Sequence, residues 1–352
     1  MKTAKITHND VLVDDFYDMP VPGPDELVIK TRSAGICGSD LHRIHALQTS
    51  GPSGHICVGH EICGEIYAAG NNVTGIQEGS RIAVEPLHRC GKCKFCCTGH
   101  YNLCDMVPFR MVMGWDPNGP GGHSEYFSMP AYSAVPVPDD LSDTEVALVE
   151  PLAVGVHAVR MAQISSRSSV AIIGAGSIGL TSLIAAIDAG AAQTIVIGRY
   201  EHQRQAALEL GATHVIQAEP GTTEDQFRTL LGKSEWPDVV IESVGGSADT
   251  TSLALQLARP GGTIMLAGAF WGNSGIAAQP IFDKELSVKG SHTYSRNEHG
   301  ATDFEHAIEL LRTNSKIAST VVTHEFSLND AKEAYRIAAN KQSGSIKVML
   351  RP

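Results

Sequence analysis

The chain has 352 residues, a hydrophobic fraction of 43% and a formal net charge of −11. This length favours two domains rather than one, and no stretch is long and apolar enough to predict a membrane partner. The acidic balance argues against a nucleic-acid partner, because such binding needs a basic surface that neutralises phosphates.

The first part of the chain, residues 1 to about 150, is rich in Gly and Pro and carries short runs with β-strand character. Examples are Glu26–Lys30 and Arg81–Val84. Runs of this kind between turn residues are typical of strands joined by loops. This part of the chain is therefore predicted to be a mostly β domain with long loops.

Four cysteines of this part form a ladder with the spacing C-x2-C-x2-C-x7-C. The four are Cys90, Cys93, Cys96 and Cys104. Thiolates at such spacing can converge on one ion, and four of them complete a tetrahedral zinc shell, which is typical of a structural site. The alternative is a set of disulfides, which is more typical of short secreted domains. Cys57, Cys63 and Cys97 remain outside the ladder and are interpreted as bystander thiols.

The cysteines also bear on the cellular compartment. All eight lie before residue 105, and the first residues do not resemble a signal peptide. A long chain with locally clustered cysteines favours metal binding in a reducing environment. The prediction is a cytoplasmic protein.

A second set of metal-ligand residue types lies upstream of the ladder and comprises Cys37 and the pair His60–Glu61. A site with only two or three protein ligands leaves a position free for a substrate, as catalytic zinc requires. The two sets together predict two zinc ions per chain, one structural and one catalytic.

From about residue 154 the pattern changes. Helices are expected at Val154–Ala162 and from the glycine run onward through Ala189. Apolar strands are expected at Val170–Ile173, Thr194–Ile197, His214–Ile216, Val239–Ile241 and Thr263–Leu266. Strands that alternate with helices predict an α/β fold with a doubly wound parallel sheet.

The turn after the first of these strands has the pattern G-x-G-x-x-G. It contains Gly174, Gly176, Ser177, Ile178 and Gly179. Because it leaves a predicted strand and opens a predicted helix, its glycines and the helix N-terminus fit a dinucleotide pyrophosphate. The alternative is a glycine-rich turn without a ligand.

The second strand ends in Gly198-Arg199, where an NAD site usually carries an acidic residue for the ribose hydroxyls. A missing carboxylate beside an arginine favours a 2′-phosphate, and hence NADP over NAD. The alternative is that Arg199 stacks on adenine or faces solvent.

Several motifs in one order make the chain resemble a zinc-dependent medium-chain dehydrogenase, nearest to the polyol, butanediol and threonine dehydrogenase branch. They are Gly35–His42, Gly59–Glu61, the cysteine ladder, Val149–Val154 and Gly174–Gly179. The resemblance covers essentially the whole chain. It implies a GroES-like catalytic domain at 1–153 and 290–352, around a Rossmann coenzyme domain at 154–289.

The resemblance also implies roles for individual residues. It makes Cys37 and His60 ligands of the catalytic zinc and Glu61 a direct or exchangeable third ligand. Glu150 stands where primary-alcohol dehydrogenases have cysteine, and it binds the zinc or a zinc-bound water; its alternative is a carboxylate that favours a helix N-terminus. Asp40 would orient His60 by accepting its second N–H, and its alternative is a turn cap.

In the same family pattern Ser39 accepts the hydroxyl proton of the substrate, which passes through the coenzyme ribose to His42 and water. Without the resemblance, Ser39 is a helix N-cap and His42 a surface residue. Val244 and Gly268, which follow later strands, are expected to contact the coenzyme together with Gly198 and Arg199.

The substrate is expected to be a secondary alcohol of a polyol, vicinal diol, cyclitol or amino alcohol, converted to its ketone. Alternatives are a primary-alcohol or aldehyde dehydrogenase, and a zinc-free quinone-reductase-like or non-catalytic coenzyme-binding member of the fold. Candidate residues of the pocket wall are Phe109, Trp115, His123 and Ser291–Arg296, with a solvent-facing loop as the alternative for His123. The resemblance implies a homodimer or homotetramer, with edge strands pairing near Trp271–Pro280.

Overall fold

The computed structural model describes residues 1–7, 10–50, 55–107, 119–219, 221, 223–231, 236–270 and 275–352. The chain divides into two compact units. The first combines Met1–Glu150 with Ser295–Pro352, and the second is the continuous stretch Pro151–Tyr294. The sequence analysis predicted the two corresponding borders at 153/154 and 289/290, three and five residues away from these.

The first unit contains a seven-stranded sheet and a three-stranded sheet. Its strands are β1 (Thr3–Thr7), β2 (Val11–Asp14), β3 (Glu26–Gly35), β4 (His55–Cys57), β5 (Glu61–Ala69), β6 (Arg81–Val84), β7 (Tyr126–Pro130), β8 (Ala134–Pro136), β15 (Val322–Ser327) and β16 (Lys347–Arg351). Its helices are α1 (Gly38–Ser50), α2 (Lys94–Cys97), α3 (Asp143–Ala147), α10 (Asp303–Thr313), α11 (Lys316–Val321) and α12 (Ala331–Ala339), with 3-10 turns η1 (Tyr101–Leu103), η2 (Ala131–Ser133), η3 (Leu328–Asp330) and η4 (Lys341–Ser343).

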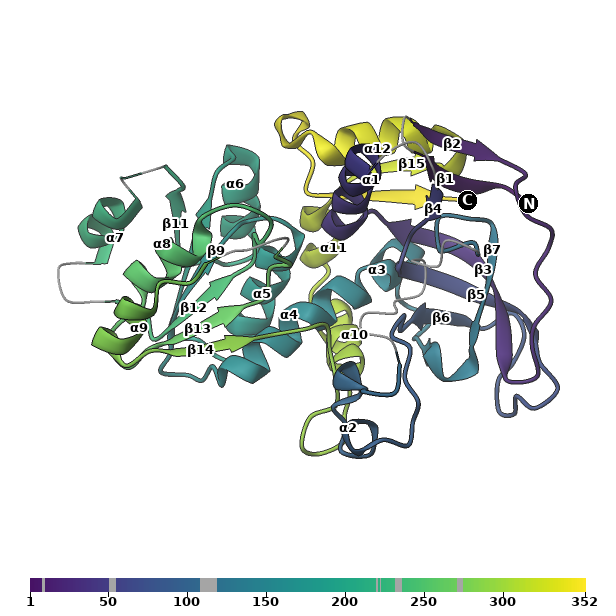
Figure 1. Ribbon diagram of the computed structural model, residues 1–352, viewed down its shortest axis with the longest axis horizontal. Helices are drawn as coiled ribbons and strands as arrows, with labels where there is room; N and C mark the ends of the chain where they lie inside the picture. The colour runs from purple at the N-terminus through teal and green to yellow at the C-terminus, as the bar shows by residue number, and fades with distance from the viewer. Residues whose placement is uncertain are drawn as a thin grey trace. The chain divides into compact units, whose positions relative to one another are not determined.

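Strand β3 is the organising strand of the larger sheet. It pairs with β5, β7 and β16, all antiparallel. Its inward side chains Leu27 and Ile29 are fully buried and pack in one core cluster with Ile62 and Phe127. Figure 1 shows β16, in yellow, beside the purple ribbon of β3, so the last part of the chain completes a sheet that the first part begins.

The second unit is built on a six-stranded sheet whose order is β11-β10-β9-β12-β13-β14, with every neighbouring pair parallel. The strands are β9 (Ser169–Ile173), β10 (Gln193–Gly198), β11 (His214–Gln217), β12 (Val239–Glu242), β13 (Thr263–Leu266) and β14 (Ser287–Gly290). The helices are α5 (Ser177–Asp188), α6 (Glu201–Glu209), α7 (Thr223–Leu231), α8 (Thr250–Leu257) and α9 (Ala278–Lys284), preceded by α4 (Val149–Ala162).

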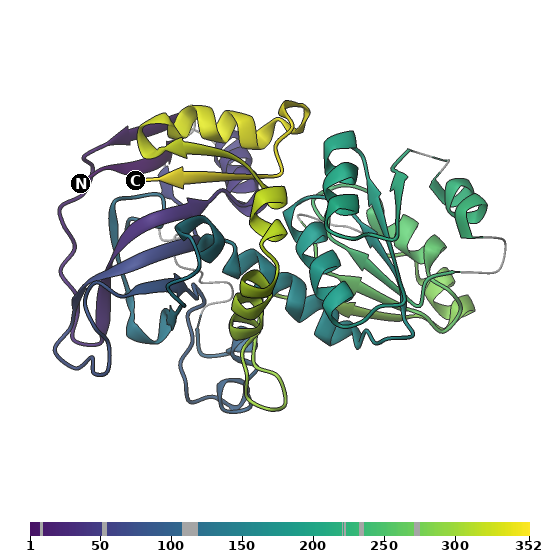
Figure 2. The same cartoon turned by 180° about the vertical axis from the view of Figure 1, so that it is seen from behind.

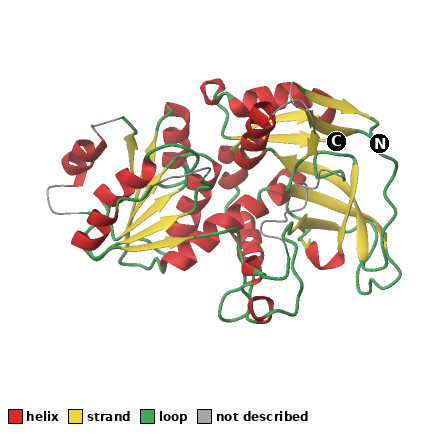
Figure 3. Cartoon of the chain, viewed as in Figure 1, coloured by secondary structure: helices red, strands yellow, loops and turns green. Residues whose placement is uncertain are grey.

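Helices lie on both faces of this sheet (Figures 2 and 3). The apolar strand residues explain this arrangement, since Ala171, Ile195, Val240 and Ile264 are all buried. A strand that is apolar along its whole length needs cover on both sides. The chain order reverses between β9 and β12, which is the switch point where doubly wound sheets bind ligands at the carboxyl ends of their strands.

The predicted doubly wound sheet is confirmed, but three local expectations were incomplete. Helix α4 begins at Val149, not Val154, because a proline in the first helical turn needs no N–H partner and Pro151 is tolerated there. Strand β14 was not expected. The pairing strand expected near Trp271–Pro280 falls partly on 271–274, outside the described residues, and its end enters helix α9.

None of the described helices has the length and apolar character that crossing a membrane would require.

Candidate functional site

The four cysteines of the ladder converge in the first unit. Their sulfur atoms all lie within 4.8 Å of one another. Two sulfur pairs, Cys90 with Cys96 and Cys93 with Cys104, are 3.9 Å apart. A disulfide would hold sulfurs at about 2.05 Å, whereas Zn–S bonds of about 2.3 Å place tetrahedral thiolates about 3.8 Å apart. The arrangement fits a four-thiolate zinc site and not disulfides.

Backbone N–H groups hold the sulfur atoms of this ladder in place. The sulfur of Cys90 accepts the N–H of Lys92 at 3.5 Å and that of Cys93 at 3.3 Å, while the sulfur of Cys93 caps α2 by accepting the N–H of Cys96. The short helix α2 therefore exists in this place because its cap is one of the ladder sulfurs.

The loop that carries the ladder is fixed at its base by Arg89. This guanidinium is ion-paired with buried Glu85 and lies over the rings of Tyr101, at 4.5 Å, and Tyr132, at 4.7 Å. On its other side, the carbonyl of Gly99 accepts the N–H of Arg296 at 3.0 Å. The loop is thus held by side-chain contacts as well as by its four sulfurs.

The second ligand set also converges, and strand register explains why. In the antiparallel pairing of β3 with β5, Gly35 lies opposite Glu61. Cys37 lies two residues after Gly35, and His60 directly precedes Glu61. The end of β3 and the start of β5 therefore bring the two residues together at one edge of the sheet. The ligand atoms of Cys37, His60 and Glu61 all lie within 4.8 Å of one another.

Asp40, which is fully buried, lies beside His60. One of its oxygens is 3.6 Å from His60 Nδ1, and the other accepts the N–H of Cys37 at 3.0 Å. Burial alone would raise the pKa of Asp40, but the nearby charge of His60 lowers it below its usual value. Burial likewise acts against the charge of His60, yet Asp40 and then Cys37 raise the pKa of His60 well above its usual value. The carboxylate therefore fixes the imidazole orientation with Nε2 left for a ligand.

Glu61 is held by a residue that the sequence analysis did not anticipate. Lys347 Nζ donates to both carboxylate oxygens of Glu61 at 2.6 Å and to the carbonyl of Ile36 at 3.2 Å. Lys347 is 2% exposed and Glu61 is fully buried. The carboxylate of Glu61 is therefore part of the metal-ligand cluster and of a buried ion pair at once.

The other expected catalytic residues occupy two helix starts. Ser39 lies in the first turn of α1, and its buried hydroxyl has no hydrogen-bond partner among the described residues. His42 lies on the same face three residues later and is exposed. Glu150, 7% exposed, lies in the first turn of α4 and acts electrostatically on Lys347, but it is not among the ligand atoms grouped within 4.8 Å.

The expectation that His123 lines a substrate pocket or a solvent-facing loop was wrong. His123 is fully buried and contacts Tyr335 Oη at 2.7 Å through Nδ1 and the carbonyl of Gly35 at 3.1 Å through Nε2. A carbonyl only accepts, so Nε2 carries the proton and Nδ1 accepts from the tyrosine. Burial, its largest influence, lowers the pKa of His123. The residue is a neutral core histidine that ties α12 to the end of β3.

Of the remaining pocket-wall candidates, Phe109 and Trp115 lie outside the described residues. Within Ser291–Arg296, Tyr294 and Ser295 are fully buried and Thr293 has a φ of 55°. A β-branched residue in the left-handed region is uncommon and strained. This segment is therefore held in a specific conformation.

The glycine-rich turn links β9 to α5 in the second unit. Gly174 has a φ of 103°, and a Cβ on Gly179 would lie 1.9 Å from the carbonyl oxygen of Gly174. Gly176 differs, because a Cβ there would meet nothing within 4 Å. It caps α5 without a side-chain hydrogen bond, and the buried Ser177 hydroxyl has no partner among the described residues. Half-buried Ile178 follows. The helix N–H groups and open space fit a pyrophosphate.

Three other turns follow neighbouring strands at the same edge of this sheet. Gly198 ends β10, and exposed Arg199 has its guanidinium 5.6 Å from the ring centre of Tyr200. Val244 follows β12 and is 44% exposed, which is unusual for a valine. Gly268 follows β13, where a Cβ would come within 2.4 Å of the Gly245 nitrogen. All three turns lie at the carboxyl ends of parallel strands, as a dinucleotide site requires.

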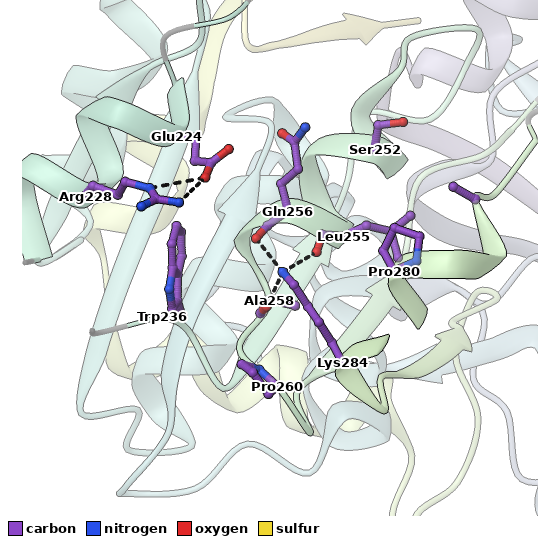
Figure 4. Close-up of a pocket in the computed structure, with 11 residues that line it drawn as sticks. Glu224, Arg228, Trp236, Ser252, Leu255, Gln256, Ala258, Pro260, Pro280 and Lys284 are labelled. Atoms are coloured by element: carbon purple, nitrogen blue, oxygen red, sulfur yellow. Dashed lines mark hydrogen bonds and ion pairs between the residues drawn. The ribbon is translucent and has the colours of Figure 1, made fainter. Parts of the chain in front are cut away.

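A separate pocket of about 540 Å³ lies on the second unit among α7, α8 and α9 (Figure 4). Its cations already have partners: Arg228 pairs with Glu224 at 2.7 Å, and Lys284 donates to the carbonyls of Leu255, Gln256 and Ala258. Pro260 and Trp236 place it near the amino ends of β12 and β13. Its size would suit a small molecule, but it lies at the strand ends where such sheets do not bind coenzyme.

The chain resembles known proteins along its whole length. A family model described as alcohol dehydrogenase GroES-like domain matches residues 23–139, and one described as zinc-binding dehydrogenase matches 177–313. Sorbitol dehydrogenase of Bacillus subtilis is 34% identical over 358 residues, with 99% of this chain and 97% of the relative covered.

Two solved structures are similar in fold and sequence. Galactitol-1-phosphate dehydrogenase of Escherichia coli superposes with a TM-score of 0.87 at 28% identity, and both chains are covered completely. A protein of Sinorhizobium meliloti described as a zinc-binding dehydrogenase and solved with NADP has a TM-score of 0.84 at 31% identity, with 100% of this chain and 99% of that chain covered.

Proposed function

Because the chain belongs to the zinc-type alcohol dehydrogenase family, we propose that it transfers a hydride between a secondary alcohol and NADP, giving the ketone. The family and the oxidoreductase activity rest on matches that span nearly the whole chain. The single observation that carries the proposed alcohol chemistry is the cluster of Cys37, His60 and Glu61, close in sequence to the Ser39 hydroxyl, which has no partner among the described residues.

The two metal sites have different chemical characters. The four thiolates of the ladder suit a closed structural zinc, while Cys37 and His60 suit an open one, with Asp40 holding the imidazole. Zinc bound in the open site would act as a Lewis acid that lowers the pKa of a substrate hydroxyl, and NADP would accept the hydride.

Ser39 and His42 supply the path of the proton. The Ser39 hydroxyl is buried and has no competing partner among the residues described, so it can accept the proton of the substrate alcohol as its own proton leaves. His42, exposed on the same helix face, can deliver that proton to solvent. A positioned relay of this kind provides general acid-base assistance.

We assign Glu61 and Glu150 supporting roles around the open site. Lys347 donates to both oxygens of Glu61, so a metal bound by Glu61 would share the carboxylate with this ammonium group. This favours an exchangeable ligand over a permanent one. Glu150, which is mostly buried at the start of α4, is the remaining carboxylate able to bind the metal or a water on it.

The choice of NADP rests on the turn after β10. It lacks an acidic residue at Gly198-Arg199, and Arg199 is exposed there. A guanidinium matches a phosphate in charge and geometry. The similar protein from Sinorhizobium meliloti that was solved with NADP supports the same choice.

The substrate class follows from the relatives, which act on sorbitol and galactitol-1-phosphate. We propose a polyol or a related diol, cyclitol or amino alcohol, handled by a homodimer or homotetramer in the cytoplasm. The strained loop at Thr293 is the described segment best suited to shape selectivity among such substrates.

The test is metal analysis of the purified protein followed by fluorescence titration with NADPH and NADH. Two zinc ions per chain and tighter binding of NADPH support the proposal and direct a substrate screen toward polyols. Two zinc ions with tighter binding of NADH would refute the NADP choice alone. One zinc ion per chain and no nucleotide binding would refute the proposal that the protein is a dehydrogenase.

A further inference from the structure

Arg204, on the inner side of α6, lies behind the end of β10. Its Nη1 donates to the carbonyls of Gly198 and Arg199, each at 3.0 Å, and its Nη2 donates to Gln217 Oε1 at 3.3 Å and is ion-paired with Glu201. The side chain is 10% exposed. Both terminal nitrogens are therefore committed to protein partners, and the residue is not free to bind a ligand.

Glu201 is the first acidic residue after β10, and its side chain is 80% exposed. A carboxylate close to this strand end is what usually binds the ribose hydroxyls of NAD and repels the 2′-phosphate of NADP. In this chain the carboxylate is turned back onto Arg204. The acidic group that would oppose NADP is present but is ion-paired with Arg204.

The neighbouring strand end is held by the same network. Gln217, opposite Gly198 in the β10–β11 register, accepts from Arg204 and donates through Nε2 to Glu219 at 2.6 Å. The charged groups of the two turns are thus Arg199, Arg204, Glu201 and Glu219. Of these, Arg199 is the exposed cation, stacked near Tyr200.

We propose that Arg204 is a positioning residue for coenzyme selectivity, which holds Glu201 away from the ribose 2′ position and leaves that position to Arg199. This inference rests on the proposed preference for NADP and names the contact that maintains that preference. Removal of the Arg204 charge would release Glu201, and a like-charge contact with the 2′-phosphate would follow. Such contacts weaken binding roughly tenfold or more.

The test compares dissociation constants of NADPH and NADH for the whole protein. Arg204→Gln is expected to raise the ratio of the NADPH constant to the NADH constant roughly tenfold. The double variant Arg204→Gln/Glu201→Gln is expected to return the ratio close to that of the unaltered protein. Arg204→Lys keeps the positive charge and is expected to retain most of the preference for NADPH. Restoration by the second substitution is a result that a merely structural role of Arg204 would not give.

The matched control is Arg228→Gln, which removes another helical arginine paired with a glutamate, Glu224, on α7 of the same unit. It should leave the ratio unchanged. If Arg204→Gln does not fold, Glu201→Gln keeps the proposal testable, because it should leave the ratio unchanged or favour NADPH. A shift of that variant toward NADH overturns the inference.

Arg199→Gln separates this inference from the proposed function. If Arg199→Gln leaves NADPH binding unchanged, the NADP assignment fails and this inference fails with it. Two outcomes would keep the NADP assignment and refute the role of Arg204, provided that Arg199→Gln weakens NADPH binding. In the first, Arg204→Gln leaves the ratio unchanged. In the second, the double variant has a ratio as altered as that of Arg204→Gln alone.

Discussion

Lys347 and Glu61 form a fully buried ion pair in which one ammonium group donates to both carboxylate oxygens at 2.6 Å. The two residues come from β16 and the start of β5, which are separated by β3 in the sheet. The pair places a compensating positive charge behind Cys37 and His60. It therefore ties the charge of the open metal site to the last strand of the first unit.

Lys347→Met should lower the free energy of unfolding by about 3–5 kcal/mol, because it leaves the buried carboxylate of Glu61 uncompensated. Lys347→Arg retains the charge, so its free energy of unfolding should fall much less. Urea unfolding of the zinc-loaded protein measures both. Equal losses in the two variants would mean that side-chain fit, and not charge, is the important factor.

The same pair predicts how stability depends on alkaline pH. Burial acts to lower the pKa of Lys347, but Glu61 and Cys37 together raise it above its usual value. A lysine whose pKa is raised on folding contributes stability that is complete below the unfolded pKa and is lost as pH rises through the folded one. Unfolding midpoints measured as the pH rises from about 10 to about 12 should fall more steeply for the unaltered protein than for Lys347→Met. Parallel curves would contradict this.

Cys37→Ala and Cys93→Ala should separate chemistry from scaffold. Cys37→Ala empties the open site and should abolish turnover with one zinc ion and most of the stability retained. Cys93→Ala removes a ladder sulfur that also caps α2, so it should lower the melting temperature and release the other zinc ion. Zinc content and thermal unfolding of both variants test this, and similar loss of folding in the two would refute the division of roles.

Ser39→Ala should reduce kcat by about 10²–10⁴-fold, the range of a general acid-base contribution, without changing coenzyme affinity. The hydroxyl has no partner within the described part of the chain, so its removal should cost little stability. Ser319→Ala, on the exposed part of α11, is a suitable control. A loss of coenzyme binding equal to the loss of kcat would argue against the proton path.

Tyr335→Phe should lower the free energy of unfolding by about 1–3 kcal/mol, since His123 Nδ1 would be left as a buried acceptor without a donor. Substrate KM should not change, because His123 is a core residue. Comparison of urea unfolding with KM for the best polyol tests both halves. An altered KM with normal stability would return His123 to the substrate pocket.

The sequence alone was sufficient to predict the features that depend on the spacing of nearby residues. The cysteine ladder, Cys37 with His60–Glu61, and the glycine turn are each defined over a few residues, and the structure brings each set together. The alternation of apolar strands with helices likewise gave the doubly wound sheet.

Features that depend on distant pairing were not predictable in the same way. Lys347 is followed by three apolar residues of its strand, which was a signal of a buried charge, but its partner is set by strand order. His123 was misplaced because a glycine-flanked histidine resembles a loop residue, whereas its partners Gly35 and Tyr335 are distant in sequence. The first turn of α4, from Val149, was not predicted, because the sequence analysis placed the helix start at Val154.

The position of β16 between β15 and β3 has a consequence for synthesis on the ribosome. Glu61 precedes Lys347 by 286 residues, so at usual elongation rates of about 5–20 residues per second it waits roughly 15–60 s for its counter-charge. The coenzyme unit, which is continuous in sequence, has no such delay and can fold during that interval. The half-built sheet of the first unit thus remains open until β16 has been synthesised, and its unpaired strand edge is the part that chaperones would need to protect.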